Sequence, residues 1–129
     1  MKIVGTAIIV NDEGKILIGQ RPEGKDLAGL WEFPGGKQEF GETIEQCIVR
    51  EIREELDVEC EVGDFLLDVV KNYKHGKFKL SVFKAKIKNE EKLRPFEHQA
   101  IKWVSVDELN DYEFPPADVD IIDFILKNF

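Results

Sequence analysis

Residues 36–58 read GKQEFGETIEQCIVREIREELDV, and this stretch holds the clearest helix of the chain. Large aliphatic side chains recur there at every fourth position: Ile44, Ile48, Ile52 and Leu56. That spacing predicts an amphipathic helix over Thr43–Leu56 with a buried apolar stripe. Thr43 is expected to cap its first turn, because Gln46 stands three residues later, as in a capping box.

Several acidic residues lie near the C-terminal end of the same helix. Glu51, Glu54 and Glu55 are related as i, i+3 and i+4, so their carboxylates share one face. Their mutual repulsion and the negative end of the helix dipole each cost about a few tenths of a kcal/mol. A hard divalent cation such as Mg²⁺, which takes oxygen ligands, would compensate this cost. The alternative is a solvated face on which Arg50 and Arg53 pair with the acids.

A glycine-rich loop precedes the helix. Pro34-Gly35-Gly36 is expected to end the short apolar piece Trp31–Phe33. Two adjacent glycines also let backbone amide and carbonyl groups approach a ligand closely. Glu42 stands at the entrance of the helix. An acid at this place either serves a site formed by the loop or only interacts favourably with the helix N-terminus.

The fixed positions of this stretch resemble the Nudix box, G-x5-E-x7-R-E-U-x-E-E-x-G-U, in which U is a bulky aliphatic residue. The matching residues are Gly36, Glu42, Arg50, Glu51, Ile52, Glu54, Glu55 and Val58. The late glycine of the box is replaced by Asp57. This residue follows the predicted helix end, where a left-handed backbone is common and aspartate tolerates it better than most residues do. We expect the replacement to cost about 1 kcal/mol of stability and to leave the acids in place.

The resemblance extends to the MutT-type members of that family, which include oxidised-purine and cytidine triphosphate pyrophosphohydrolases. It is carried by the segments Leu30–Lys37, Glu97–Gln99 with Trp103, and Pro115–Asp118. It implies an α/β (α+β) fold, namely an α/β/α sandwich with a mixed β-sheet. It also implies Mg²⁺-dependent hydrolysis of a (deoxy)nucleoside triphosphate to the monophosphate and pyrophosphate, with Mn²⁺ as the alternative metal. Substrates such as 8-oxo-dGTP or (d)CTP would give the protein a role in nucleotide-pool sanitisation and so in DNA repair.

Two other functions stay open at this point. One is a Nudix hydrolase of ADP-ribose or of a dinucleoside polyphosphate. The other is a nucleotide-binding regulator without turnover, which the complete set of Glu51, Glu54 and Glu55 disfavours.

The resemblance also implies roles for single residues. Glu51, Glu54 and Glu55 would bind the metal, together with a carbonyl oxygen of Gly35 or Gly36. Glu42 would assist catalysis from the loop, and Arg50 would pair with Glu42 or Glu51 and hold that loop. The general base would be Glu51 or Glu97, and the alternative for Glu97 is a plain surface acid.

Substrate-binding roles are predicted for four further residues. Arg21 and Lys37 would contact phosphate, since guanidinium and ammonium groups suit phosphate oxygens. Asp118 would contact the base, because an ionised carboxylate accepts the cytosine amine and a protonated one donates to a purine. Phe78 would stack on the base. The alternatives are a loop arginine, a helix cap at Asp118 and a core residue at Phe78. We expect His98 to be an ordinary surface residue.

The remaining segments predict a mixed sheet with helices on both faces. Lys2–Val10 and Lys15–Gln20 are expected to pair as a hairpin. Two further strands, 60–73 and 77–87, are expected to join at a turn at His75-Gly76, and another strand is expected at 101–106. A short helix capped by Asp107 and a C-terminal helix over Pro115–Phe129 complete the chain.

Composition narrows the class of protein. The 129 residues suggest one domain spanning 1–129, and 43% apolar residues suffice for a core. A net charge of −8 argues against binding to a nucleic acid polymer. The apolar runs are too short for a membrane span, so we expect a cytoplasmic protein with a nucleotide as its partner. Cys47 and Cys60 are expected to be reduced thiols, and both a monomer and a homodimer stay open.

Overall fold

The structure is a computed structural model that describes residues 1–74 and 76–129. Its strands are β1 (Lys2–Ile9), β2 (Ile16–Gln20), β3 (Trp31–Glu32), β4 (Gly35–Lys37), β5 (Cys60–Tyr73), β6 (Gly76–Ile87) and β7 (Ala100–Val104). Its α-helices are α1 (Ile44–Leu56) and α2 (Val119–Asn128). Three short 3-10 helices are η1 (Glu90–Lys92), η2 (Val106–Asp111) and η3 (Pro116–Asp118). The predicted turn at His75-Gly76 falls on residue 75, which lies outside the described residues.

The strands form two sheets. The larger has the order β4-β1-β6-β5 and is mixed, because β1 runs parallel to β6 while the other neighbours are antiparallel. The smaller has the order β3-β2-β7 and is antiparallel. The β5–β6 register shifts between Val62 and Leu67, which bends these long strands. Strands β3 and β4, which follow one another in the chain, thus lie at the edges of the two sheets.

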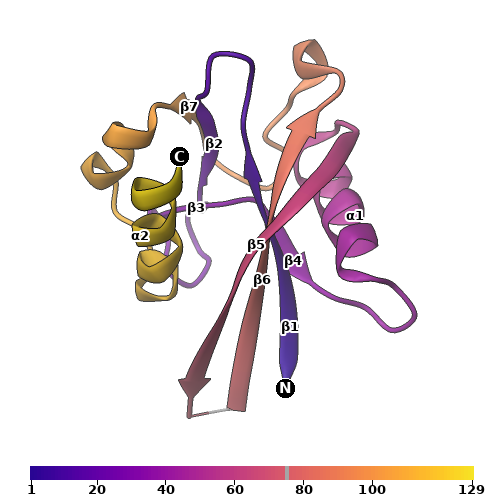
Figure 1. Cartoon of the computed structure of the whole chain (residues 1–129), viewed down its shortest axis with the longest axis vertical. Helices are drawn as coiled ribbons and strands as arrows, with labels where there is room; N and C mark the ends of the chain where they lie inside the picture. The colour runs from indigo at the N-terminus through magenta and orange to yellow at the C-terminus, as the bar shows by residue number, and fades with distance from the viewer. Residues whose placement is uncertain (75) are drawn as a thin grey trace.

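Two apolar cores make this an α/β/α sandwich, as predicted. Figure 1 shows α1 and α2 on opposite sides of the long strands β1, β5 and β6. Ala7 and Ile9 of β1 pack with α1, whereas Ile8, between them, packs with α2. This alternation follows from the two-residue period of a strand. The sheet therefore holds α1, with its acids, in a fixed position on one face.

Helix α1 forms as the sequence predicts. Thr43 Oγ1 accepts a hydrogen bond from the Gln46 amide at 3.1 Å, and Gln46 Oε1 accepts one from the Thr43 amide at 2.9 Å. Ile48, Ile52 and Leu56 are fully buried. The helix ends at Asp57, whose φ of 57° is left-handed as expected.

Several predicted elements are wrong in detail. β1 and β2 do not form a hairpin ladder within the described residues: they meet at one antiparallel bridge, Val10 with Ile16, and each pairs with a strand from later in the chain. The predicted end of the Trp31–Phe33 piece is confirmed, since β3 ends at Glu32, but Gly35 and Gly36 begin a separate strand, β4, which pairs with β1. Ser105, not Asp107, caps η2 with Glu108 as its box partner.

The C-terminal helix is shorter than predicted. The segment Pro116–Asp118 forms a 3-10 turn, and α2 begins only at Val119. Pro116 is a proline and has no amide hydrogen to donate. This suits the first turn of the 3-10 helix, where an amide would have no partner within the helix. No helix in the described part of the chain is long and apolar enough to cross a membrane.

Candidate active site

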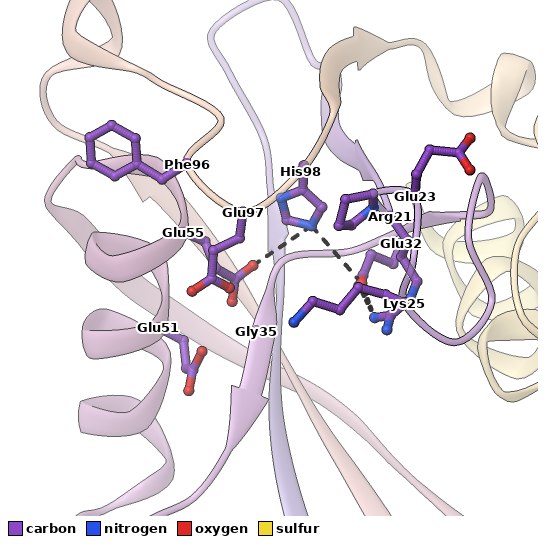
Figure 2. Close-up of a pocket in the computed structure, with 11 residues that line it drawn as sticks. Arg21, Glu23, Lys25, Glu32, Gly35, Glu51, Glu55, Phe96, Glu97 and His98 are labelled. Atoms are coloured by element: carbon purple, nitrogen blue, oxygen red, sulfur yellow. Dashed lines mark hydrogen bonds and ion pairs between the residues drawn. The ribbon is translucent and has the colours of Figure 1, made fainter.

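A cavity of about 580 Å³ opens where helix α1 meets two loops. We call it the carboxylate cavity (Figure 2). Glu51 and Glu55 come from α1, Glu97 and His98 from the loop before β7, and Arg21 and Lys25 from the loop after β2. Segments far apart in the sequence therefore meet at this cavity: Glu51, Glu55 and Glu97 lie on one side, and Arg21 and Lys25, with Glu23 and Glu32 beside them, lie on the other (Figure 2). Carboxylates that face cationic groups across a cavity suit a phosphate bound with a cation.

Arg50 organises the acids of the helix and the preceding loop. Its guanidinium pairs with Glu42 at 2.8 Å, Glu51 at 2.9 Å and Glu54 at 3.2 Å, so it binds both of the acids predicted as its partners. It also donates to the Lys37 carbonyl oxygen at 3.0 Å. The hydrogen bond from Arg50 lowers the pKa of Glu42 to about 2. One arginine thus fixes the loop against the helix.

The carboxylate of Glu51 occupies the space that a side chain at Gly36 would fill. A Cβ on Gly36 would lie 2.6 Å from Oε1 of Glu51, so any larger residue would displace this carboxylate. The Gly36 carbonyl oxygen accepts a hydrogen bond from the buried Cys47 thiol at 3.4 Å. The loop backbone and the first helix acid are therefore packed directly against each other, with a carbonyl oxygen beside a carboxylate.

Glu55 is buried, at 4% exposure, among other acids. Burial, followed by hydrogen bonding with Glu51, raises the pKa of Glu55 to about 10. Crowded carboxylates of this kind are the groups that a divalent cation stabilises in the ionised form. Glu54, by contrast, is half-exposed and lies at the edge of the cluster.

The donor set fits a hard divalent cation. Carboxylate and carbonyl oxygens are its preferred ligands, and the glycine beside Glu51 leaves them room. As the side chains stand, the described residues contain no group of three His, Cys, Asp or Glu side chains close enough to hold a metal ion. Arg50 instead binds Glu51 and Glu54. A cation would compete with Arg50 for these carboxylates.

The loop that carries Glu97 is attached to the end of α1. The Phe96 amide donates to the Glu55 carbonyl oxygen at 2.9 Å, and the Arg94 amide donates to that of Leu56 at 3.0 Å. These carbonyls would otherwise lack partners at a helix end. The position of Glu97 at the cavity is therefore set relative to Glu55.

The expectation for His98 is wrong. It is 8% exposed, and its Nε2 lies 3.9 Å from carboxylate oxygens of both Glu32 and Glu55. The ring fits because residue 19 is glycine: a Cβ there would lie 2.6 Å from His98 Cδ2. Burial lowers the pKa of His98. A histidine next to Glu97 gives no local signal of burial, because the contact with Gly19 depends on the pairing of β2 with β7.

Glu32 was missed by the sequence reasoning. It pairs with Arg21 at 2.9 Å, and both side chains are partly buried. Arg21 also donates from Nε to the Asp26 carbonyl oxygen at 2.7 Å. The available signal was a charged residue between Trp31 and Phe33, two aromatic residues expected to pack.

A second depression, the sheet cleft, adjoins the carboxylate cavity on the α2 side of β1 and β6. It consists of two hollows of about 270 and 790 Å³ that share Arg21 and Leu27. The smaller is lined by Asp118 and Lys37, and the larger by Phe78. Arg21 lines both hollows as well as the carboxylate cavity.

The predicted base-binding residues therefore share one cleft. Asp118 makes no capping hydrogen bond with α2, although it precedes the helix. Burial, followed by the charge of Glu32, raises the pKa of Asp118 to about 7. Phe78 lies on β6 opposite Lys2, whose ammonium is 5.7 Å from the ring centroid. Lys37 lies with Asp118 rather than in the carboxylate cavity.

Residues 5–124 match the NUDIX domain family. The chain belongs to the Nudix family. The matched range contains the whole lining of the carboxylate cavity and all of α1, and the match makes the protein a Nudix hydrolase. Asp57 takes the left-handed position at which the Nudix box has glycine.

Several relatives of this Nudix hydrolase have names that describe action on nucleotides. A protein of Escherichia coli (strain K12) named CTP pyrophosphohydrolase is 38% identical over 117 residues, which are 91% of this chain and 86% of that protein. An 8-oxo-dGTP diphosphatase of Haemophilus influenzae is 36% identical over 130 residues, covering 96% of this chain and 90% of that protein.

Two solved structures share this fold. The E. coli ORF135 protein superposes with a TM-score of 0.84 at 38% identity, covering 98% of this chain and 89% of that one. The MutT protein from Methanosarcina mazei Go1 gives a TM-score of 0.81 at 28% identity, covering 98% and 91%.

Proposed function

We propose that this Nudix hydrolase converts a nucleoside triphosphate, with Mg²⁺, into the nucleoside monophosphate and pyrophosphate. The observation that supports this proposal most directly is the adjacency of the two depressions. Arg21, Glu32 and Gly35 line both the carboxylate cavity and the hollow that contains Asp118. A nucleotide can therefore place its base against the sheet and its phosphates beside the carboxylates. The names of the relatives agree with such a substrate.

The residues of α1 and its loop would hold the metal. Glu51, Glu54 and Glu55 supply carboxylates, and Gly35 or Gly36 supplies a carbonyl oxygen. A bound divalent cation neutralises phosphate oxygens and makes phosphorus more electrophilic. Arg50 and Glu42 would hold the loop and the acids of α1 in fixed relative positions.

Glu97 is the general base in this proposal. In the described residues its carboxylate has no hydrogen bond or ion pair, whereas Glu51 is paired with Arg50 at 2.9 Å. An unpaired carboxylate at the cavity can take a proton from water. The water oxygen forms a bond to one of the two phosphorus atoms of the α–β linkage, the bridging P–O bond breaks, and the monophosphate and pyrophosphate separate. Arg21 contacts the phosphates from the opposite side.

Asp118 would select the base. With a pKa of about 7, both its forms are populated at neutral pH. The ionised form accepts a hydrogen bond from the cytosine amine, and the protonated form donates one to an oxidised purine. We therefore expect the ratio of kcat/KM for dCTP to that for 8-oxo-dGTP to rise between pH 6 and pH 8. The same ratio in Asp118→Asn should not change with pH.

The test measures pyrophosphate release from dCTP, 5-methyl-dCTP, 8-oxo-dGTP and the four normal deoxynucleotides, with Mg²⁺ and with a chelator. Glu54→Gln should lower kcat by at least about 100-fold, which corresponds to roughly 3 kcal/mol of transition-state stabilisation. Glu45→Gln removes a charge from the exposed first turn of α1 and is the matched control. Turnover that survives both the chelator and Glu54→Gln would contradict the metal site. Absence of cleavage of every triphosphate would refute the substrate class and direct the search to ADP-ribose and dinucleoside polyphosphates.

A further inference from the structure

Lys25 stands in the carboxylate cavity, although nothing in its sequence context marked it. It belongs to the loop 21–30 between β2 and β3. Figure 2 shows its side chain extending into the cavity, across from α1 and the Glu97 loop. The facing acids are Glu51, Glu55 and Glu97. A long cationic side chain here faces a wall of negative charge across a space large enough for phosphate groups.

The loop beneath Lys25 is closed by its own hydrogen bonds. The Gly29 amide donates to the Arg21 carbonyl oxygen at 3.0 Å, and Arg21 Nε donates to the Asp26 carbonyl oxygen at 2.7 Å. Gln99, from the loop before β7, donates to the Arg21 carbonyl oxygen at 3.0 Å. The Lys25 backbone is therefore held at the cavity by contacts on both sides of it.

The two basic residues of the cavity differ in their partners. Arg21 is bound to Glu32 at 2.9 Å and to the Asp26 backbone. The ammonium of Lys25 makes no hydrogen bond or ion pair with any of the described residues. It is therefore free to bind a ligand, whereas Arg21 is partly neutralised. An ammonium is also a good phosphate partner as a point charge.

We propose that Lys25 binds the phosphates farthest from the base, those that become pyrophosphate. This inference rests on the proposed function. Lys25 lines the carboxylate cavity but neither hollow of the sheet cleft, where Asp118 and Phe78 lie. Its charge consequently acts on the end of the substrate away from the base. The charge on these phosphates is redistributed as the P–O bond breaks, and a fixed cation stabilises it.

The experiment compares wild type, Lys25→Ala, Lys25→Arg and the control Lys127→Ala. Lys127 is exposed on α2 and lines none of the cavities described. Calorimetric titration with inorganic pyrophosphate in Mg²⁺ should give a Kd about tenfold higher for Lys25→Ala, as expected for one lost charge-assisted contact. Lys25→Arg should restore most of the affinity, and Lys127→Ala should match wild type. Inhibition by the nucleoside monophosphate should be unchanged in all four proteins.

Equal pyrophosphate affinity in wild type and Lys25→Ala would overturn the proposal, as would a wild type that does not bind pyrophosphate. A weakening of monophosphate inhibition equal to that of pyrophosphate binding would also overturn it, because Lys25 would then act on the site as a whole. Failure of the proposed function has a different signature. Wild type would then release no pyrophosphate from any triphosphate, whatever its affinity for pyrophosphate itself.

Discussion

Replacement of Asp118 by asparagine should change how stability depends on pH. The pKa of this carboxyl is raised from its ordinary value of 3.8 to about 7 by burial first and by Glu32 second. Between those two values the unfolded chain has lost the proton that the folded chain still holds. Folding stability therefore falls as pH rises through this window, and the loss is complete above pH 7. The slope for one such group is about 1.4 kcal/mol per pH unit.

Asparagine has nearly the same shape and does not titrate. We expect Asp118→Asn to gain stability relative to wild type by about 2 to 3 kcal/mol between pH 5 and pH 8. Urea unfolding at intervals across this range measures the difference. Asp123→Asn, an exposed change on the adjoining helix α2, controls for the loss of one negative charge. A constant difference between Asp118→Asn and wild type from pH 5 to pH 8 would refute the reasoning, because the carboxyl would then be solvated in the folded protein.

Three further substitutions test the packing around the site. Gly36→Ala should lower kcat/KM at least about 100-fold with little change in urea midpoint, since its Cβ displaces the Glu51 carboxylate and a misplaced site group costs this much. Gly19→Ala should destabilise the fold by about 1–3 kcal/mol in urea unfolding, because it crowds the buried His98 ring. Asp57→Gly should raise stability by about 0.5–1 kcal/mol, since glycine accepts a φ of 57° without strain, and its kcat should equal that of wild type.

For each of these three substitutions, one result would contradict the reasoning. Full activity in Gly36→Ala would mean that Glu51 does not need its observed position. An unchanged urea midpoint in Gly19→Ala would mean that the His98 ring moves at no cost. A lower stability of Asp57→Gly would mean that the Asp57 side chain contributes more than its backbone conformation costs.

Several features that depend on residues close together in the sequence were predicted correctly. Helix α1 was predictable because its stripe, its Thr43 cap and its box partner Gln46 lie within a few residues of one another. The left-handed backbone at Asp57 was predicted from the same stretch, because Asp57 follows the end of the helix. The clustering of acids on one helix face likewise depends only on helical periodicity.

Contacts between distant segments were not predictable in this way. The parallel pairing of β1 with β6 joins residues on either side of α1 and β5, and no short pattern specifies it. Burial of His98 depends on the glycine opposite it in β2. The position of Lys25 depends on how its loop closes on Arg21. Charged residues in loops carry no periodicity, so their direction is known only once the fold is known.

The two hydrogen bonds from Arg94 and Phe96 to the end of α1 have a consequence for how the chain can vary. They fix Glu97 to the helix directly, so the segment 89–92 between β6 and these bonds does not set its position. That segment contains the exposed helix η1. Insertions or deletions there can alter the outline of the protein while the spacing between the helix acids and Glu97 stays constant, because lengthening a surface loop costs little free energy. The chain therefore separates a part that can change in length from a part that must keep its geometry, and the boundary between them lies at Leu93, which packs against the core of α1.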